Sequence, residues 1–281
     1  MSIRRHQTGT GESTTRTFSI IIAGLAHAGL RPQEFSVVSL GRCEHDEGVS
    51  IHALSIPREV LNCVSELRKL DLYLETNDDL FKNPKTWQTH TSTFLSRCPH
   101  LRHLRLAFRD WKHTERVFAS VAQKVVLPKL EVLILDNIRC AGADLRQFLE
   151  AHPGLRSLRL ENLDVTGSIT FADTLSVLEV KHDRLVDFRC DQIAQNSFRL
   201  FFDTLGKLDE CTDWHYRLED NQEALDFWAD FVSVLEPFKY IGIAEAWEGV
   251  QQKIGLLRDD IRVSTRDYHP DYPLGGYWWY V

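Results

Sequence analysis

A leucine pattern occurs twice near the middle of this chain and limits what the chain can fold into. Residues 130–135 read Leu-x-x-Leu-x-Leu, and residues 155–160, which begin 25 positions later, read the same. In each copy two leucines stand two residues apart, so they point to one face of a short strand. The third leucine lies three residues upstream, in the turn that leads into the strand. One copy cannot bury its leucines alone, so the pattern predicts units that stack their strands edge to edge.

Similar triplets recur along the chain, with helical patterns between them. In chain order they begin at Phe35, Leu67, Leu101, Leu130, Leu155 and Leu175. The linkers at 93–97 and 143–149 have helical patterns, and Pro99 and Pro153 follow them and end the helices. We therefore expect an α/β fold, a leucine-rich-repeat-like solenoid of parallel strands with helices on the outer face. The alternative is a set of unrelated amphipathic segments in an ordinary α/β domain.

The organisation of the chain follows from these repeats. We expect a loose N-terminal tail at 1–13, the leucine-rich-repeat-like solenoid at 14–190 and a C-terminal α+β capping region at 191–281, because a stack of repeats needs a terminal unit over its last apolar face. A helix is predicted from Ser13 to about Gly29. The apolar run inside it superficially resembles a secretory signal, but its large side chains fall on one helical face.

The capping region has its own predicted elements. Strands are expected at 198–202 and 214–218, and helices at 221–235 and 246–262. The aromatic tail at 268–281 either belongs to the cap or offers an exposed aromatic patch to a partner.

Composition and charge exclude several classes of protein. The net charge of -7 is spread over both signs, so the chain lacks the basic footprint of a nucleic-acid-binding protein. No run approaches the roughly 18 apolar residues of a membrane span. The six cysteines lie far apart with no paired spacing, which favours reduced, mostly buried thiols over a disulfide framework. We expect an intracellular protein, in the cytoplasm or nucleus, that binds neither nucleic acid nor membrane.

The sequence lacks the common motifs of catalysis and metal binding. It contains no G-x-S-x-G, H-E-x-x-H, G-x-G-x-x-G or Walker-type G-K-[ST] pattern. The segments 98–103 and 43–52 each hold three metal-ligand residue types, but neither spacing matches a known site. Asp213, His215 and Asp220 are the polar set on which a minority hypothesis of an enzyme would rest. We expect no catalytic residue, no metal and no cofactor, and hence no enzyme.

The predicted strands also define a binding face. If Leu104 and Leu106 point inward, pleating points their neighbours outward, and the same argument in each unit builds columns of outward residues across the sheet. The central column reads Asp71, Arg105, Ile134, Arg159 and Glu179, and the flanking columns end at Val177 and Lys181. A central apolar pair rimmed by arginines is typical of a protein-binding patch. The expected partner-binding residues are Tyr73, His103, Arg105, Val132, Ile134 and Arg159.

The segments 18–30, 98–106, 127–135 and 152–160 look like the repeat half of fungal F-box-type proteins. In that family the F-box docks on the adaptor of a cullin-RING ubiquitin ligase, and the repeats hold the substrate. No clear F-box precedes the repeats here. Residues 54–61 resemble the opening of one, but the next triplet follows at once, so we interpret 57–65 as a repeat helix that begins at Pro57.

The function expected from the residues and from the resemblance is non-enzymatic. The chain is expected to be a leucine-rich-repeat protein-protein interaction module that binds a protein partner, of identity unknown from the sequence, through its strand face. The alternative is a substrate-recognition subunit of a cullin-RING ubiquitin ligase with a cryptic or missing F-box, and its partner would then include the ligase adaptor.

Overall fold

The computed structural model describes residues 2–3, 11–37, 48–76, 87–111, 113–182, 184–185, 187–202, 258 and 261–267. Its α-helices are α1 (Gly11–His27), α2 (Arg58–Leu61), α3 (His90–Leu95), α4 (Thr114–Lys124), α5 (Gly142–Ala151) and α6 (Phe171–Lys181), and its 3-10 helices are η1 (Ile51–Leu54), η2 (Asn62–Val64) and η4 (Trp87–Thr89). Its strands are β1 (Ser2–Ile3), β2 (Glu34–Val37), β3 (Val49–Ser50), β4 (Lys69–Glu75), β5 (His103–Phe108), β6 (Val132–Ala141), β7 (Ser157–Thr166), β8 (Asp187–Gln195), β9 (Phe198–Phe202) and β10 (Ile261–Asp267).

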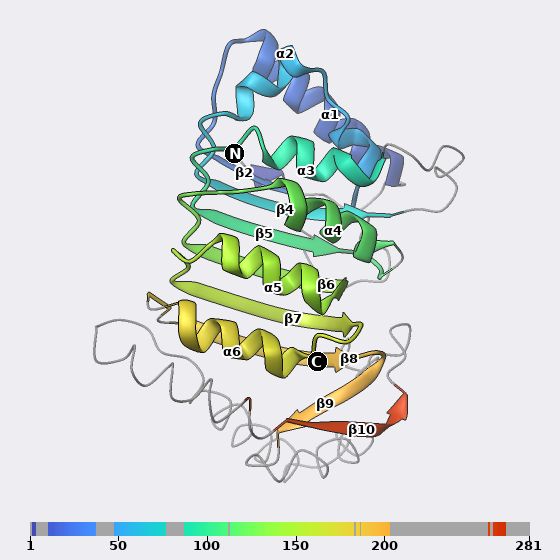
Figure 1. Cartoon of the computed structure of the whole chain (residues 1–281). Helices are drawn as coiled ribbons and strands as arrows, with labels where there is room; N and C mark the ends of the chain where they lie inside the picture. Colours follow the sequence, from blue (N-terminus) through green and yellow to red (C-terminus); the bar gives the residue numbers. More distant parts are fainter. Residues whose placement is uncertain are drawn as a thin grey trace, which may run out of the picture.

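The described strands form one ten-stranded sheet. Apart from the short β3, neighbouring strands in it follow chain order (Figure 1). The order is β1, β2, β4, β5, β6, β7, β8, β9 and β10, and β3 pairs with the end of β4. The strands from β1 to β8 pair in parallel, whereas β9 and β10 add antiparallel pairs. The expected α/β class is therefore confirmed, as a parallel sheet of eight strands with helices.

Helices α3 to α6 lie in one row against one face of the sheet (Figure 1). Each connects two parallel strands, and the helices predicted at 93–97 and 143–149 are found as α3 and α5. Helix α6 starts with a capping box, in which Asp173 donates its backbone N–H to Thr170 and accepts one from it.

No helix in the part of the chain that the structure describes is long and apolar enough to cross a membrane.

The core lies between the sheet and this row of helices. Leu104, Leu133 and Leu158 stand in register on adjacent strands, and each is 0% exposed. A second row, two residues further along each strand, is buried in the same way. From the helices, Phe118 and Phe148 meet over these rows with ring centroids 5.7 Å apart. The inward direction of the leucines, predicted from the pleat, is confirmed.

The last predicted repeat unit is wrong. Leu175 lies in helix α6, and the strand that pairs with β7 is β8, where Phe188 stands beside Leu158 and Cys190 beside Leu160. Two leucines three residues apart fit one face of a helix as well as the start of a repeat, so the pattern at 175 was ambiguous. Burial selects apolar side chains and not leucine itself, so Phe and Cys serve in β8.

The first predicted unit is displaced by three residues. Phe35 stands beside Leu70 in the sheet, and Val37 stands beside Leu72. Phe35 is thus the first inward residue of strand β2 and not the residue of the turn that leads into the strand. Phe35 is 0% exposed and packs edge-on against Phe18 of helix α1, with ring centroids 5.7 Å apart.

Three strands are interrupted at one level by residues in the left-handed backbone region. Asn137, Asn162 and Gln192 have φ of 56°, 50° and 52° on β6, β7 and β8. Each is an extra outward residue at the same level of its strand, so inward alternation and the register both resume after it. We call this shared irregularity the bulge, although none of the three strands has more residues there than the others. Asn162 Nδ2 donates to Asn137 Oδ1 at 2.7 Å, and Asn137 Nδ2 donates to the carbonyl of Phe108 at 2.8 Å. These amides tie the strands together where their ladders are disrupted.

Predictions for the ends of the chain are met in part. The predicted first helix is α1, but the tail expected to be loose includes β1, which pairs with β2. The strand predicted at 198–202 is β9, and the boundary expected at residue 190 falls inside β8. Strand β10 begins at Ile261, so the helix expected at 246–262 does not reach residue 262. The elements expected at 214–218 and 221–235 and the aromatic tail lie outside the described residues.

Candidate binding face

The six predicted partner-binding residues all lie on the face of the sheet opposite the buried leucines. Tyr73 is on β4, His103 and Arg105 on β5, Val132 and Ile134 on β6, and Arg159 on β7. Each is partly exposed, while Leu104, Leu133 and Leu158 between them are fully buried. Because neighbouring side chains on a strand point to opposite faces, the two sets are separated by the sheet.

The register brings five of the six residues together around strand β6. His103 stands beside Val132, and Arg105 stands beside Ile134. On the other side of β6, Arg159 stands beside Ile134. Tyr73 lies further away, beside Ala107 and with β5 between it and β6.

The columns continue onto β8 with residues that the sequence analysis did not select. Arg189 stands beside Arg159, and Asp187 stands beside Ser157. The predicted column ends were Glu179, Val177 and Lys181, and all three belong to helix α6. The available signal was the triplet Leu-x-x-Phe-x-Cys at 185–190, which keeps the repeat spacing with other apolar residues. We call the outward residues of β4 to β8 before the bulge the open face; those whose side chains the structure describes are Lys69, Asp71, Tyr73, His103, Arg105, Ala107, Val132, Ile134, Asp136, Ser157, Arg159, Glu161, Asp187 and Arg189.

Charged pairs bridge neighbouring strands on the open face. His103 Nε2 on β5 lies 3.0 Å from Asp71 Oδ1 on β4. Arg105 Nη2, also on β5, donates to Asp136 Oδ2 on β6 at 2.8 Å. Each pair links two neighbouring strands, as the backbone hydrogen bonds do. The two pairs therefore fix the orientation of His103 toward β4 and of Arg105 toward β6.

On β8 one carboxylate serves several partners. Asp187 accepts a hydrogen bond from Ser157 Oγ at 2.8 Å, and nitrogens of Arg159 and Arg189 each lie 3.6 Å from its oxygens. Two guanidinium groups therefore share one carboxylate at a distance longer than a good charge-assisted hydrogen bond. The two arginines outnumber the one carboxylate that they share, so Arg159 and Arg189 keep N–H donors for an external anion.

The electrostatics of Asp71 at the other end are different. Burial alone would raise the pKa of its carboxyl group, but hydrogen bonds from His103 and Ser36 and the charges of His103 and Lys69 outweigh burial and hold that pKa below its usual range. Ser36 Oγ on β2 donates to Asp71 Oδ2 at 2.8 Å. Asp71 is therefore ionised, and its close partners His103, Ser36 and Lys69 all belong to the protein, so it holds the face together instead of offering a charge to a partner.

Beyond the bulge the same side of the sheet is covered. Trp111, from the loop after β5, packs against Ala194 of β8, which is 0% exposed. Asp164 of β7 is also 0% exposed; it accepts the backbone N–H of Ser197 at 3.0 Å and lies 3.3 Å from Arg139 Nε. Burial raises the pKa of Asp164 despite these contacts. On β7 and β8 the outward side chains before the bulge are therefore the uncovered ones, and the bulge marks the limit of the open face there.

The candidate metal ligands do not converge. Cys98 is buried, whereas His103 lies on the open face and pairs with Asp71. Across the described residues, no group of three or more His, Cys, Asp or Glu side chains could hold a metal ion. The other candidate set lies mostly outside those residues, as do Asp213, His215 and Asp220.

The cysteines described by the structure are free thiols, and three of the four are buried. Burial raises the pKa of Cys98 to about 12 and raises the pKa of Cys140 further. Thiols with raised pKa values are protonated at neutral pH and are poor nucleophiles. The predicted burial is confirmed for Cys63, Cys98 and Cys140.

The fold and site define an α/β protein with a parallel, chain-ordered sheet, one face of which is covered by helices and the other partly open and charged. A scan of protein-family models and a search of curated proteins found no match to this chain.

Proposed function

We propose that this protein is a leucine-rich-repeat-type solenoid that binds a partner protein through its open face and catalyses no reaction. The strand order supports the repeat architecture, since strands β2 to β8 follow chain order, apart from the short β3 at the end of β4, whereas a doubly wound Rossmann sheet reverses direction at the switch point where its ligand binds. The single row of helices on one face supports it as well (Figure 1). Equivalent strand positions recur at intervals between 25 and 35 residues, within or slightly above the usual repeat lengths.

The observation that carries the binding proposal is the pair Val132 and Ile134. Both side chains are partly exposed at the centre of a charged surface. Ile134 has an arginine beside it on each neighbouring strand, whereas Val132 lies between His103 and Ser157. Apolar groups enclosed by a polar rim are the usual composition of a protein-binding hot spot, because the rim excludes water from the central contact.

The charges indicate what kind of partner segment fits. An apolar anchor would cover Val132 and Ile134, and a carboxylate beside it would meet Arg159 and Arg189, which share one aspartate. Arg105 is less available, because Asp136 already accepts its hydrogen bond at 2.8 Å. We therefore expect Arg159 to contribute more to partner binding than Arg105.

The resemblance to the repeat half of fungal F-box-type proteins supports a more specific form of this proposal. In that form the open face holds a substrate for a cullin-RING ubiquitin ligase. The helical segment interpreted as a repeat element, rather than as an F-box opening, corresponds to α2 and η2, which lead into β4. Adaptor docking would then require an element elsewhere in the chain.

The test is affinity capture with the tagged full-length chain from a fungal extract, with bound proteins identified by mass spectrometry. Val132→Thr/Ile134→Thr removes the apolar centre and keeps β-branched side chains on the strand. Arg159→Gln removes one cation without placing a negative charge beside Asp187. Arg116→Gln, an exposed arginine on helix α4, is the matched control on the opposite face.

A partner retained by the control and lost with both open-face variants supports the proposal. Co-capture of the adaptor and a cullin identifies the protein as a ligase receptor. A partner retained by the open-face variants and lost with Arg116→Gln overturns the assignment of the binding surface.

A further inference from the structure

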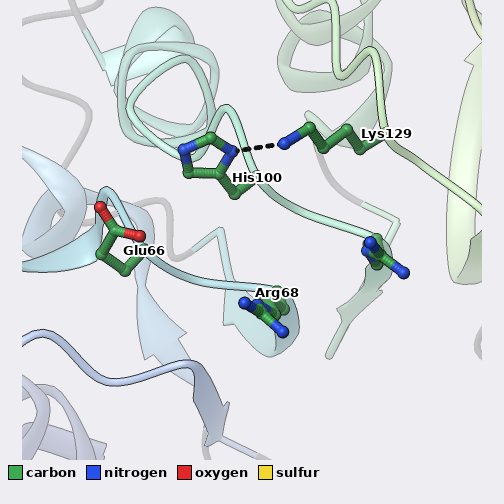
Figure 2. A pocket seen from close by; sticks show the side chains of 5 residues that line it. Glu66, Arg68, His100 and Lys129 are labelled. Carbon is green, nitrogen blue, oxygen red and sulfur yellow. Dashed lines mark hydrogen bonds between the residues drawn. The ribbon is translucent and has the colours of Figure 1, made fainter.

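A hollow opens at the edge of the sheet where the strands begin, next to the open face (Figure 2). Its volume is about 160 Å³. It is lined by Glu66, Arg68, His100, Arg102 and Lys129. These residues come from the turns before β4, β5 and β6, so three successive units contribute to one site. None of them was selected as a site residue from the sequence.

The repeat spacing explains why basic side chains gather here. Leu67, Leu101 and Leu130 anchor the three turns in the core. The residues just before and just after these leucines point away from the core and stack between units. The backbone N–H of Arg102 donates to the carbonyl of Arg68 at 2.8 Å, which places the two arginines one strand spacing apart.

The cations of the hollow are only weakly neutralised. Arg102 Nη1 lies 3.8 Å from Glu131, and both side chains are largely exposed, so this contact is worth little in water. Glu66 lies 4.0 Å from Arg31 in an equally exposed pair. Arg68 makes no ion pair with any other residue that the structure describes. The backbone N–H groups of Arg68, Arg102 and Glu131 are already used in the ladder, so side chains supply the binding groups.

Lys129 donates to His100 Nδ1 at 3.0 Å, the contact drawn in Figure 2. An ammonium group has donors only, so the ring nitrogen Nδ1 of His100 is the acceptor in this contact. The ring positions the ammonium group over the hollow without cancelling its charge. Lys129 keeps two further N–H donors for a ligand.

We propose that this hollow binds the phosphoryl group of a phosphorylated peptide segment. Two arginine forks and one ammonium group match several oxygens of a dianion better than the two oxygens of a single carboxylate. Glu66 at the rim opposes any anion, so a weakly charged ligand would gain little. The choice of a peptide as carrier rests on the proposed function, because a chain lying on the open face reaches this edge directly beside Lys69 and His103.

The test is an NMR titration of the full-length protein with inorganic phosphate and with a short glycine-rich peptide centred on phosphoserine. The unphosphorylated peptide and a version with glutamate at the centre are run alongside. Backbone amide signals of the hollow are expected to shift with phosphate and phosphopeptide only. Arg68→Gln and Lys129→Gln should each weaken phosphopeptide binding roughly tenfold, since each removes a charge-assisted hydrogen bond.

Two controls keep the result interpretable. Arg184→Gln removes an equally exposed cation before β8, outside the hollow, and should leave affinity unchanged, whereas Glu66→Gln should tighten binding. Val132→Thr/Ile134→Thr should also leave binding of these small probes unchanged, so failure of the open face is distinguishable from failure of the hollow. Equal binding of the glutamate peptide, equal loss with Arg184→Gln, or binding to phosphoinositide vesicles without binding to the phosphopeptide would each overturn the proposal.

Discussion

Two adjacent residues on β6 test whether the faces of the sheet are assigned correctly. Leu133 is 0% exposed and lies between Leu104 and Leu158, so Leu133→Ala removes buried methyl groups and leaves a cavity. Such truncations cost roughly 2–5 kcal/mol in the free energy of unfolding. Ile134 is only partly buried on the open face, where full burial of an Ile side chain would be worth about 1.5–3 kcal/mol. Ile134→Ala should therefore cost about 1 kcal/mol.

Urea denaturation followed by circular dichroism measures both losses in the same background. The buried position should lose about 2 kcal/mol more than its exposed neighbour, with similar denaturant dependence. Leu133→Asp should prevent folding, because it would bury an unpaired carboxylate. Equal losses at the two positions, or a larger loss at Ile134, would show that the open face is the packed one and would remove the basis of the binding proposal.

Two further outcomes follow from single contacts. The folded-state pKa of Asp71 is held below the ordinary value of 3.8, so the stability that it contributes is present in full above that pH and is lost as pH falls through the lowered value. Asp71→Asn should therefore destabilise the protein at neutral pH, and its difference from the parent should shrink below about pH 4 in urea titrations; a constant difference would contradict the role given to His103 and Ser36. Gly142→Ala should destabilise by about 2 kcal/mol or more, because the added Cβ would lie 2.1 Å from the carbonyl oxygen of Ile169. Gly24→Ala in helix α1, where nothing lies within 4 Å of the added Cβ, should instead stabilise by about 0.5–1 kcal/mol, and thermal unfolding of the pair distinguishes the two cases.

The central strands could be predicted because their pattern has only one consistent explanation. Leucines two residues apart at Leu133 and Leu135, repeated at Leu158 and Leu160, fit a strand period and no helical one. Prolines after the intervening helical patterns then locate the turns. The outward direction of Arg105 and Ile134 followed directly, because successive side chains on a strand point to opposite faces of the sheet.

The outer units could not be predicted by the same rule. Strand β8 uses Phe188 and Cys190 at inward positions, and the leucines at 175 and 178 belong to a helix instead. A search for leucine therefore favoured the wrong segment. The bulge at Asn137, Asn162 and Gln192 was also missed. Asparagine can adopt a positive φ but usually does not, so its presence in the sequence does not by itself predict a bulge.

The sequence by itself determined which side chains of the central strands face the core, because alternation along a strand is a local property of each segment. Only the tertiary structure decided which charges meet, for example that Arg159 and Arg189 share Asp187 while Arg105 is used by Asp136. It also decided that turns far apart in the chain bring Arg68, Arg102 and Lys129 around one hollow. The physical reason is that these contacts depend on which strands are neighbours and in what register, and both are set by the packing of the whole sheet against its helices.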